Sequence, residues 1–444
     1  MTSRPLTPNQ HHAVRADHHS APVVRPCAGT ECSTTSRRTV MSASACAPTL
    51  LNDPAERAAL IAAARELVPL LRAHAAETEG RGNLAPEVDA ALRAGGFYTL
   101  TAPRMFGGRE AGVRTVIDVF AELALGCGSS SWVGKIHCGA AFMASLFDDQ
   151  AREDIWGKDS HAAVSAATNG AASNSVRSAP GGIKVSGEWR YVSGIHQAQW
   201  VLLRVVVDAG TTAEPDIRLA LLPARDMVIT NTWDVAGMEG TGSDSVVVRD
   251  AFVPEYRTLA GWRLGGSEQR WQEGERVYNA SVSSWLGVSL AGPIIGMAQG
   301  ALDHVLGTLA GKPITGSTYT DAVRSPSVQL GVADAASLID TARLHAYRAA
   351  ADIEAASIEG RRLDVAARAR IRMDNGVVMQ RCREAMERIL DISGTAGFRR
   401  SNPLQRFWRD LATGSRTATV STSLSREIYG RALLGIEEQV TEIV

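Results

Sequence analysis

Hydrophobic side chains recur at the spacing of an α-helix in two separate parts of the chain. In residues 52–149, Asp53-Pro54 can cap and open a helix, and leucines then follow at helical intervals. Towards the C terminus, Ala-rich stretches such as 337–359 and 366–392 have the same period. Both parts are therefore predicted to consist of helices.

The stretch between these two parts has the pattern of β-strands instead. Short runs of β-branched and aromatic residues, separated by Gly, Pro and Asp turns, occur at residues 185–192, 200–207, 217–222 and 245–252. Helices, then strands, then helices predict an α+β fold class. The predicted segments are a disordered tail at 1–50, a helical domain at 51–155, a β-domain at 156–265 and a helical domain at 275–444.

The first 50 residues are rich in Pro, Ser, Thr, Ala and His and have no apolar period. We expect this tail to be disordered, with Met41 as a second candidate for the first residue, and it lacks the apolar run of a secretory signal. The pairs His11-His12 and His18-His19 resemble a metal site. The tail offers no further ligands, and we predict no bound metal.

Composition and charge narrow the range of partners. Of the 444 residues, 45% are hydrophobic and 5% aromatic, and the heavy use of Ala suits long helices packed through small side chains. A formal net charge of −1 favours neither nucleic acid nor an acidic membrane as a partner. The longest apolar runs, such as 200–207, are too short to span a bilayer. The cysteines include no CxxC pair, so we expect reduced thiols and a cytoplasmic protein.

Four ordered motifs give the chain a family resemblance. They are AGGF with APRMFGG at 94–108, a Gly- and Thr-containing turn followed by a strand at 233–254, ISGTAG at 392–397 and LQRFWRD at 404–410. In this order they resemble the signatures of the acyl-CoA dehydrogenase superfamily over about residues 55–435. The resemblance implies an N-terminal helical domain, a central β-barrel-like domain and a C-terminal four-helix bundle. It also implies a homotetramer.

Two of the motifs are more specific. SSSW at 129–132 and QRFWRD at 405–410 are similar to those of the two-component flavin-dependent monooxygenases. The resemblance implies reduced FMN or FAD supplied by a separate flavin reductase, and reaction with O2 through a flavin hydroperoxide. The flavin-binding residues that it implies are Trp132, Thr168, Asn169, Ser193, Gly194, Thr241, Ser243, Gly394, Thr395, Arg406 and Arg409.

Within that set, the hydroxyl of Ser193 is predicted to lie beside flavin N5, where it can accept a hydrogen bond. From the sequence alone, Ser193-Gly194 is also an ordinary turn after a strand. Arg406 and Arg409 either hold the flavin phosphate or form salt bridges on a helix surface. Gly240 to Ser243 is no P-loop, since no Lys follows it.

The absence of certain side chains bears on the reaction. Segment 416–422 has no Asp or Glu, so it lacks the base that thioester dehydrogenation requires. The resemblance implies that phenol-hydroxylating members carry two histidines where this chain has Ala140 and Ala412, which leaves His137 and His196 as catalytic candidates or as structural residues.

Because an amine attacks without such a base, these absences favour N-oxygenation. The chain thus resembles the amino-sugar N-oxygenases (nitrososynthases) of antibiotic biosynthesis, with Arg416 binding substrate phosphate. The alternatives are an aromatic, polyketide or sulfur hydroxylase, an acyl-CoA dehydrogenase, and a non-catalytic scaffold.

Overall fold

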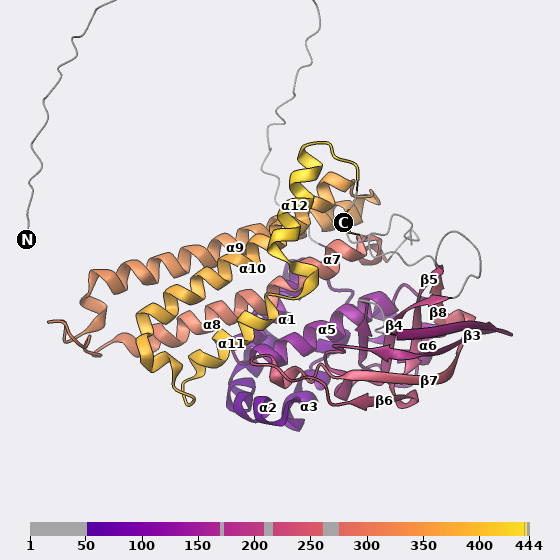
Figure 1. Ribbon diagram of the computed structural model, residues 1–444, viewed down its shortest axis with the longest axis horizontal. Coiled ribbons are helices and arrows are strands. Elements are labelled where there is room, and N and C mark those ends of the chain that lie inside the picture. Colours follow the sequence, from indigo (N-terminus) through magenta and orange to yellow (C-terminus); the bar gives the residue numbers. More distant parts are fainter. Residues whose placement is uncertain (1–50, 169–172, 208–215, 261–274, 439, 442–444) are drawn as a thin grey trace, which may run out of the picture. The chain divides into compact units, whose positions relative to one another are not determined.

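Residues 51–168, 173–207, 216–260, 275–438 and 440–441 are described by the computed structural model (Figure 1). The predicted disordered tail and Asn169 lie outside these residues. The first described part is helical, as predicted. Its helices are α1 (Pro54–Ala73), α2 (Ala75–Arg81), α3 (Pro86–Ala94), α4 (Val113–Ala124), α5 (Gly128–Ala144) and α6 (Asp149–Trp156).

Local chemistry fixes the ends of these helices. The Asp53 carboxylate accepts a hydrogen bond from the Ala55 amide at 2.7 Å and caps α1, while Pro54 stands in its first turn. Helix α5 is the central helix of this part, because all its residues except Ile136 are buried. A helix that is buried all round can contribute one of its sides to an internal cavity.

The middle part contains two four-stranded sheets. One has the order β1-β4-β5-β8 and the other β2-β3-β7-β6, and the β1–β4 pair is parallel. The strands are β1 (Val164–Ala167), β2 (Ser173–Ala179), β3 (Gly182–Trp189), β4 (Trp200–Val207), β5 (Asp216–Pro223), β6 (Met227–Thr230), β7 (Ser245–Pro254) and β8 (Thr258–Ala260).

The apolar core of this part includes side chains from both sheets, such as Val185 of β3 and Leu203 of β4. Among the described residues, no strand pairing joins the two sheets. The domain is therefore built as two packed sheets. Strand β3 ends at Trp189, three residues before the predicted end, and the chain then leaves the sheet.

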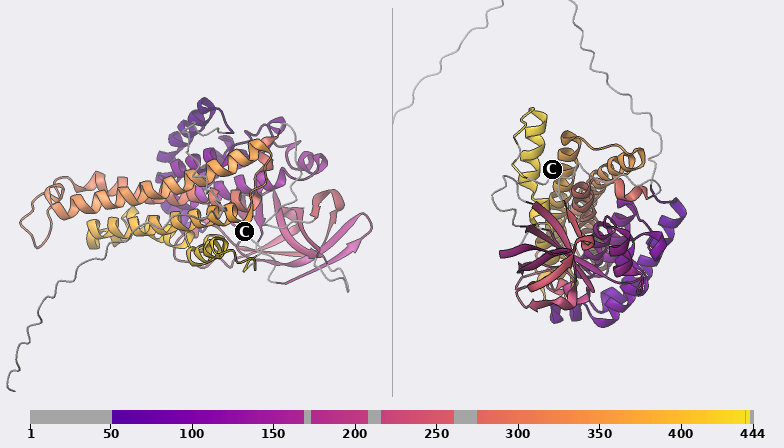
Figure 2. Two further views of the ribbon diagram at one scale, coloured as in Figure 1. Left: turned by 90° about the horizontal axis from the view of Figure 1, so that it is seen from above. Right: turned by 90° about the vertical axis from the view of Figure 1, so that its right-hand side faces the viewer.

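The C-terminal part is again helical. Helices α8 to α11 lie side by side (Figures 1 and 2), and a single apolar core includes residues of these helices, of α1 to α6 and of β1. The helices are α7 (Val282–Ser289), α8 (Ala291–Leu309), α9 (Pro326–Glu359), α10 (Val365–Ser393), α11 (Pro403–Gly414) and α12 (Thr422–Leu433).

The continuous segment of α7 and α8 corrects one expectation from the sequence. Residues 282–309 are long and apolar enough to cross a membrane, although no such run was expected. In the structure, 83% of the apolar window is buried inside the fold. Its composition is explained by its position in the protein core, where a helix is apolar on all sides.

Candidate functional site

A cavity of about 770 Å³ lies where α5, α7, α10 and the segment after α11 meet the β-domain. This volume suits a cofactor ring together with a small organic molecule. Much of the wall is apolar, with Trp132, Ile136 and Met143 of α5 and Leu286 of α7. The remaining described lining is basic or carries hydroxyl groups, apart from the amide of Asn375, and it includes no Asp or Glu.

One end of the cavity is formed by the aromatic ring of Trp132 and by the segment at the end of α11. A Cβ atom added to Gly414 would lie 3.3 Å from the Trp132 ring and 2.6 Å from Met238. Only glycine therefore fits between these two side chains without displacing one of them. Trp132, predicted to lie beside the flavin ring, does line the cavity.

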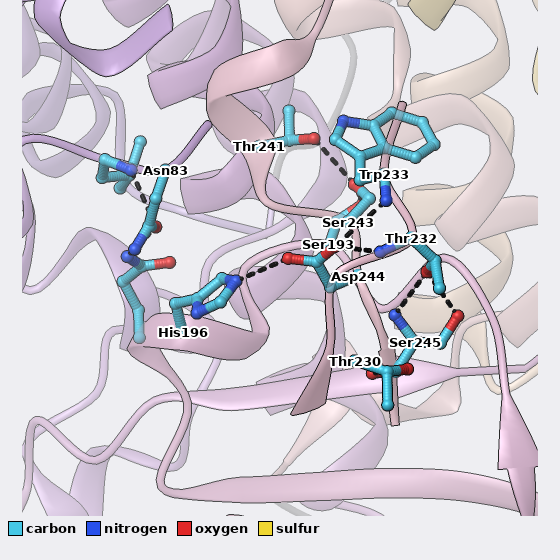
Figure 3. A network of polar contacts seen from close by, with 12 residues as sticks. Asn83, Ser193, His196, Thr230, Thr232, Trp233, Thr241, Ser243, Asp244 and Ser245 are labelled. Carbon is cyan, nitrogen blue, oxygen red and sulfur yellow. Dashed lines mark hydrogen bonds and ion pairs between the residues drawn. The ribbon is translucent and has the colours of Figure 1, made fainter. Parts of the chain in front are cut away.

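A chain of hydroxyl groups follows the β-domain side of the same end (Figure 3). Ser193 and Ser243 are joined by a hydrogen bond of 2.7 Å between their Oγ atoms, and Thr241 Oγ1 lies 2.7 Å from Ser243 Oγ. Thr168 lies on the same lining. Four of the hydroxyl-bearing residues predicted for flavin binding are thus brought together from segments far apart in the sequence.

Backbone geometry holds Ser193 in place. Gly194 has a φ of +71°, which glycine adopts without strain, and its amide donates to the Thr241 carbonyl at 3.0 Å. Ser165 Oγ donates to the Ser193 carbonyl at 2.8 Å. Gly194 itself does not line the cavity among the described residues; it shapes the turn that presents Ser193.

His196 supports this turn from outside the cavity. Its Nε2 lies 2.8 Å from the Asp244 carboxylate, which also accepts hydrogen bonds from the backbone amides of Thr232 and Trp233 (Figure 3). Burial raises the pKa of Asp244, but these hydrogen bonds outweigh burial and hold it below its ordinary value. The described cavity lining does not include His196, so its contacts are those of a positioning residue.

His137, the other histidine candidate, is fully buried. Its Nδ1 lies 2.8 Å from the Val164 carbonyl, its ring packs on Tyr98 at 4.5 Å, and a Cβ on Gly194 would lie 2.7 Å from its Nε2. Burial lowers the pKa of His137 to about 4, so the ring is neutral at physiological pH. Among the described residues, His137 is not part of the lining and instead packs behind the Ser193-Gly194 turn.

The carboxylate of Asp410 holds another turn of the lining. Met238 has a φ of +60°, which is unusual for a side-chain-bearing residue, and its amide donates to Asp410 Oδ1 at 2.6 Å. The Met238 carbonyl accepts hydrogen bonds from Trp233 Nε1 at 2.9 Å and from Thr241 Oγ1 at 2.8 Å. Asp410 thus fixes the start of the hydroxyl chain without lining the large cavity.

The two arginines of the RFWRD motif are engaged in ion pairs. Arg406 Nε donates to Glu79 at 2.9 Å, and Arg409 pairs with Glu79 and, at 3.1 Å, with Glu239. Burial raises the pKa of Glu79, but the two arginines outweigh it and hold that pKa below its ordinary value. These contacts correspond to the alternative in which Arg406 and Arg409 form salt bridges instead of holding the flavin phosphate. Neither arginine lines the large cavity; Arg406 lines a second one of about 340 Å³.

Three further predicted residues lie in different places. Gly394 and Thr395 are exposed at the end of α10 and do not belong to the described cavity lining. Arg416 does line the cavity, and its guanidinium donates to the Ala412 carbonyl at 2.7 Å. Arg416 therefore lies where a bound molecule can reach it.

Four further lining residues were not predicted. They are Lys135 of α5 and three residues of α10, Arg368, Arg372 and Asn375. No family motif covers these positions. The helical period of α5 would have indicated Lys135, because this lysine follows Trp132 by three residues and therefore lies on the same face of the helix.

Known proteins match this chain over most of its length. The family model "Acyl-CoA dehydrogenase, C-terminal domain" matches residues 288–422. The FADH(2)-dependent resorcinol hydroxylase, oxygenase component, of Rhizobium sp. (strain MTP-10005) is 30% identical over 83% of this chain and 92% of its own. The oxygenase subunit HsaA of a flavin-dependent monooxygenase of Rhodococcus jostii (strain RHA1) is also 30% identical, over 83% of this chain and 97% of its own.

This chain belongs to the oxygenase components of the two-component flavin-dependent monooxygenases. Its cofactor is a flavin, and a flavin reductase is the partner of such a component. The structure of XiaF from Streptomyces sp. in complex with FADH2 and glycerol superposes with a TM-score of 0.81 at 29% identity, over 87% of this chain and 98% of that one. The acyl-CoA dehydrogenase-like fold is thereby confirmed.

The narrower expectation of an amino-sugar N-oxygenase is not supported. KijD3, solved in complex with FMN and a dTDP-linked amino sugar, superposes with a TM-score of 0.73 but is only 19% identical, which is a likeness of fold alone. The relatives that match at 30% identity are named as a resorcinol hydroxylase and as a monooxygenase subunit. The comparisons therefore favour the aromatic alternative for this oxygenase.

Proposed function

We propose that this oxygenase hydroxylates a phenolic aromatic compound with reduced flavin and O2. The observation that carries the proposal is the character of the cavity lining, which combines an apolar wall with basic groups and has no carboxylate among its described residues. The basic residues of that lining are Lys135, Arg190, Arg204, Arg368, Arg372 and Arg416.

This lining separates the candidate reactions. An aliphatic amine is an ammonium ion near neutral pH, and the described lining offers it basic side chains but no carboxylate partner. Thioester dehydrogenation needs a base at the reacting carbon, and the described lining offers no carboxylate for that role. A phenol combines an apolar ring with an acidic hydroxyl and fits both parts of the wall.

We place the flavin ring at the end of the cavity that holds Trp132 and the hydroxyl chain. The donor set fits a flavin, because the hydroxyls of Thr168, Ser193 and Ser243 can pair with the polar edge of the ring while Trp132 packs beside it. When bound there, reduced flavin supplies the electrons that activate O2. Ser193 would hold a proton at the N5 edge, and the apolar wall would exclude water.

The proposed reaction is tested with a panel of matched substrates. We expect the purified chain, supplied with a flavin reductase, NADH and labelled dioxygen, to add one labelled oxygen atom to phenols in product analysis by mass spectrometry. Aliphatic amines and amino sugars in the same assay should remain unchanged. Oxygen transfer to the amines and none to the phenols would overturn the proposal and restore N-oxygenation.

We also propose that the enzyme is a homotetramer. Helices α9 and α12 expose large apolar side chains, with Leu330 and Leu344 of α9 at 66% and 70% exposure and Leu433 of α12 at 69%. Large apolar groups that recur on helix surfaces are typical of subunit contacts. Light scattering during gel filtration should give about four times the chain mass of 47.2 kDa. A monomer would contradict the proposal.

A further inference from the structure

Lys135 shares one face of α5 with the aromatic end of the cavity. Trp132, Lys135, Ile136, Gly139 and Ala140 all line the cavity, at the intervals of three and four residues that define one side of a helix. The lysine amine therefore lies within the same enclosed space as the Trp132 ring. It is a nucleophilic and titratable group in the site that no motif had indicated.

The surroundings of this amine are unusual for a lysine. The residue is only 3% exposed, and the one hydrogen bond of its Nζ to the described residues is to the Leu286 carbonyl, at 3.4 Å. No carboxylate of the described chain pairs with it at salt-bridge distance. An ammonium group has three donors, so most of its capacity is left for a bound molecule. Burying such a group without an anionic partner costs stability.

Small residues leave room beside the amine. A Cβ on Gly139 would lie 3.5 Å from Lys135 Nζ and 3.3 Å from Leu286. Ala140 follows on the same turn and carries only a methyl group. Asn375 of α10 donates to the Gly287 carbonyl at 2.7 Å, next to the carbonyl that Lys135 binds, and its Oδ1 is buried without a partner among the described residues. The two side chains therefore bind consecutive carbonyls of α7, and Asn375 brings an acceptor without a described partner to this part of the lining.

Burial favours the neutral form of Lys135, and the described side chains that line the cavity with it include no carboxylate. The Cys138 thiol on α5 is neutral, because burial raises its pKa to about 12. Helix α7 contributes the hydroxyls of Ser283 and Ser284. The other titratable groups of the described lining are one phenol and five guanidiniums: Tyr191, Arg190, Arg204, Arg368, Arg372 and Arg416. Burial lowers the pKa of Lys135 itself to about 8.

We infer that Lys135 accepts the proton of an acidic aromatic hydroxyl and then holds the resulting phenolate in the cavity. The O–H bond of the substrate breaks, an N–H bond forms on the neutral amine, and the electron pair stays on the oxygen. The phenolate donates electron density to its ring, which prepares a ring carbon for attack on an electrophilic oxygen. This inference rests on the proposed function and gives its substrate class a recognition group.

The first test uses para-nitrophenol, whose phenolate is coloured, with the chain free of flavin. We expect the pKa of the bound probe to fall by about one unit or more relative to the free probe, because the ammonium that forms stabilises the phenolate. Lys135→Met should remove this shift, and Lys135→Gln serves as a second variant. Lys158→Met, on an exposed lysine, is the matched control and should behave like the wild type.

A wild-type chain that leaves the pKa of the probe unchanged would overturn the inference. The same holds if both Lys135 variants shift the pKa of the probe as much as the wild type does. Turnover separates this result from the proposed function. For the best phenol of the panel, Lys135→Met should lower kcat on the order of a hundredfold and remove the limb of the pH profile near 8. A shifted probe without turnover of any phenol supports the proton acceptor but contradicts the proposed function.

Discussion

Lys135→Met is expected to make the protein more stable at pH 7 while it impairs the reaction. Burial lowers the pKa of this lysine from 10.5 to about 8, so folding forces a proton-binding group into a site where its charged form is disfavoured. A tenfold change in a proton-binding constant corresponds to about 1.4 kcal/mol, which sets the cost of the protonated amine at about 3 kcal/mol. Methionine has a similar length and no charge.

The pH dependence gives the prediction its sign. Below pH 8 the lysine is protonated in both states and the full cost is present. Between pH 8 and about 10.5 the unfolded chain binds more protons than the folded one, so wild-type stability rises with pH. Guanidinium unfolding should therefore show a gain for Lys135→Met at pH 7 that shrinks towards pH 10. Lys158→Met should change stability by less than about 0.5 kcal/mol, and a destabilised Lys135→Met would contradict the prediction.

Variants of Asp410 test how strongly one buried carboxylate stabilises the cavity wall. Burial raises its pKa to about 7, although the Met238 amide and the neighbouring arginines lower it. A carboxyl whose folded pKa lies above its unfolded value contributes stability that is present at low pH and lost as pH rises through about 7. Asp410→Asn stays neutral, so its stability relative to the wild type should rise between pH 5 and pH 8, by up to about 3 kcal/mol.

Asp410→Ala has a different expected result. It leaves the buried Met238 amide without its acceptor, which costs about 1–3 kcal/mol at every pH. Because the Met238 carbonyl anchors Trp233 and Thr241, the hydroxyl chain should loosen and reduced flavin should bind more weakly. Calorimetric unfolding and anaerobic flavin titration measure the two effects. Equal flavin affinity in the Ala and Asn variants would show that the turn does not depend on this contact.

The fold could be predicted from periodicity because its elements are regular. The predicted strand at 200–207 is β4, and the predicted helix at 366–392 is α10 within one residue at either end. The strand predicted at 185–192 ends earlier, since Tyr191 adopts a φ of +64° and the chain turns out of the sheet towards Ser193. Such a departure depends on contacts with Asp244 and Thr241, far away in the sequence.

The site was predictable only where a motif marks it. Trp132, Ser193 and Ser243 belong to recognisable segments, and all three line the cavity. Lys135 belongs to no motif, and a lysine in a helix is exposed far more often than buried. The absent histidines were interpreted as a sign of an amine substrate; the sequence could not reveal that α5 and α7 enclose a lysine amine in the same space.

The basic lining of the cavity also has a kinetic consequence. Reduced flavin carries phosphate and must diffuse from the reductase to this oxygenase before it is lost to free O2. A cavity whose described lining has basic but no acidic side chains attracts such an anion over about 10 Å at 0.1 M ionic strength. The electric field that favours an ionised substrate therefore also speeds capture of the cofactor, and both advantages weaken together as salt is added.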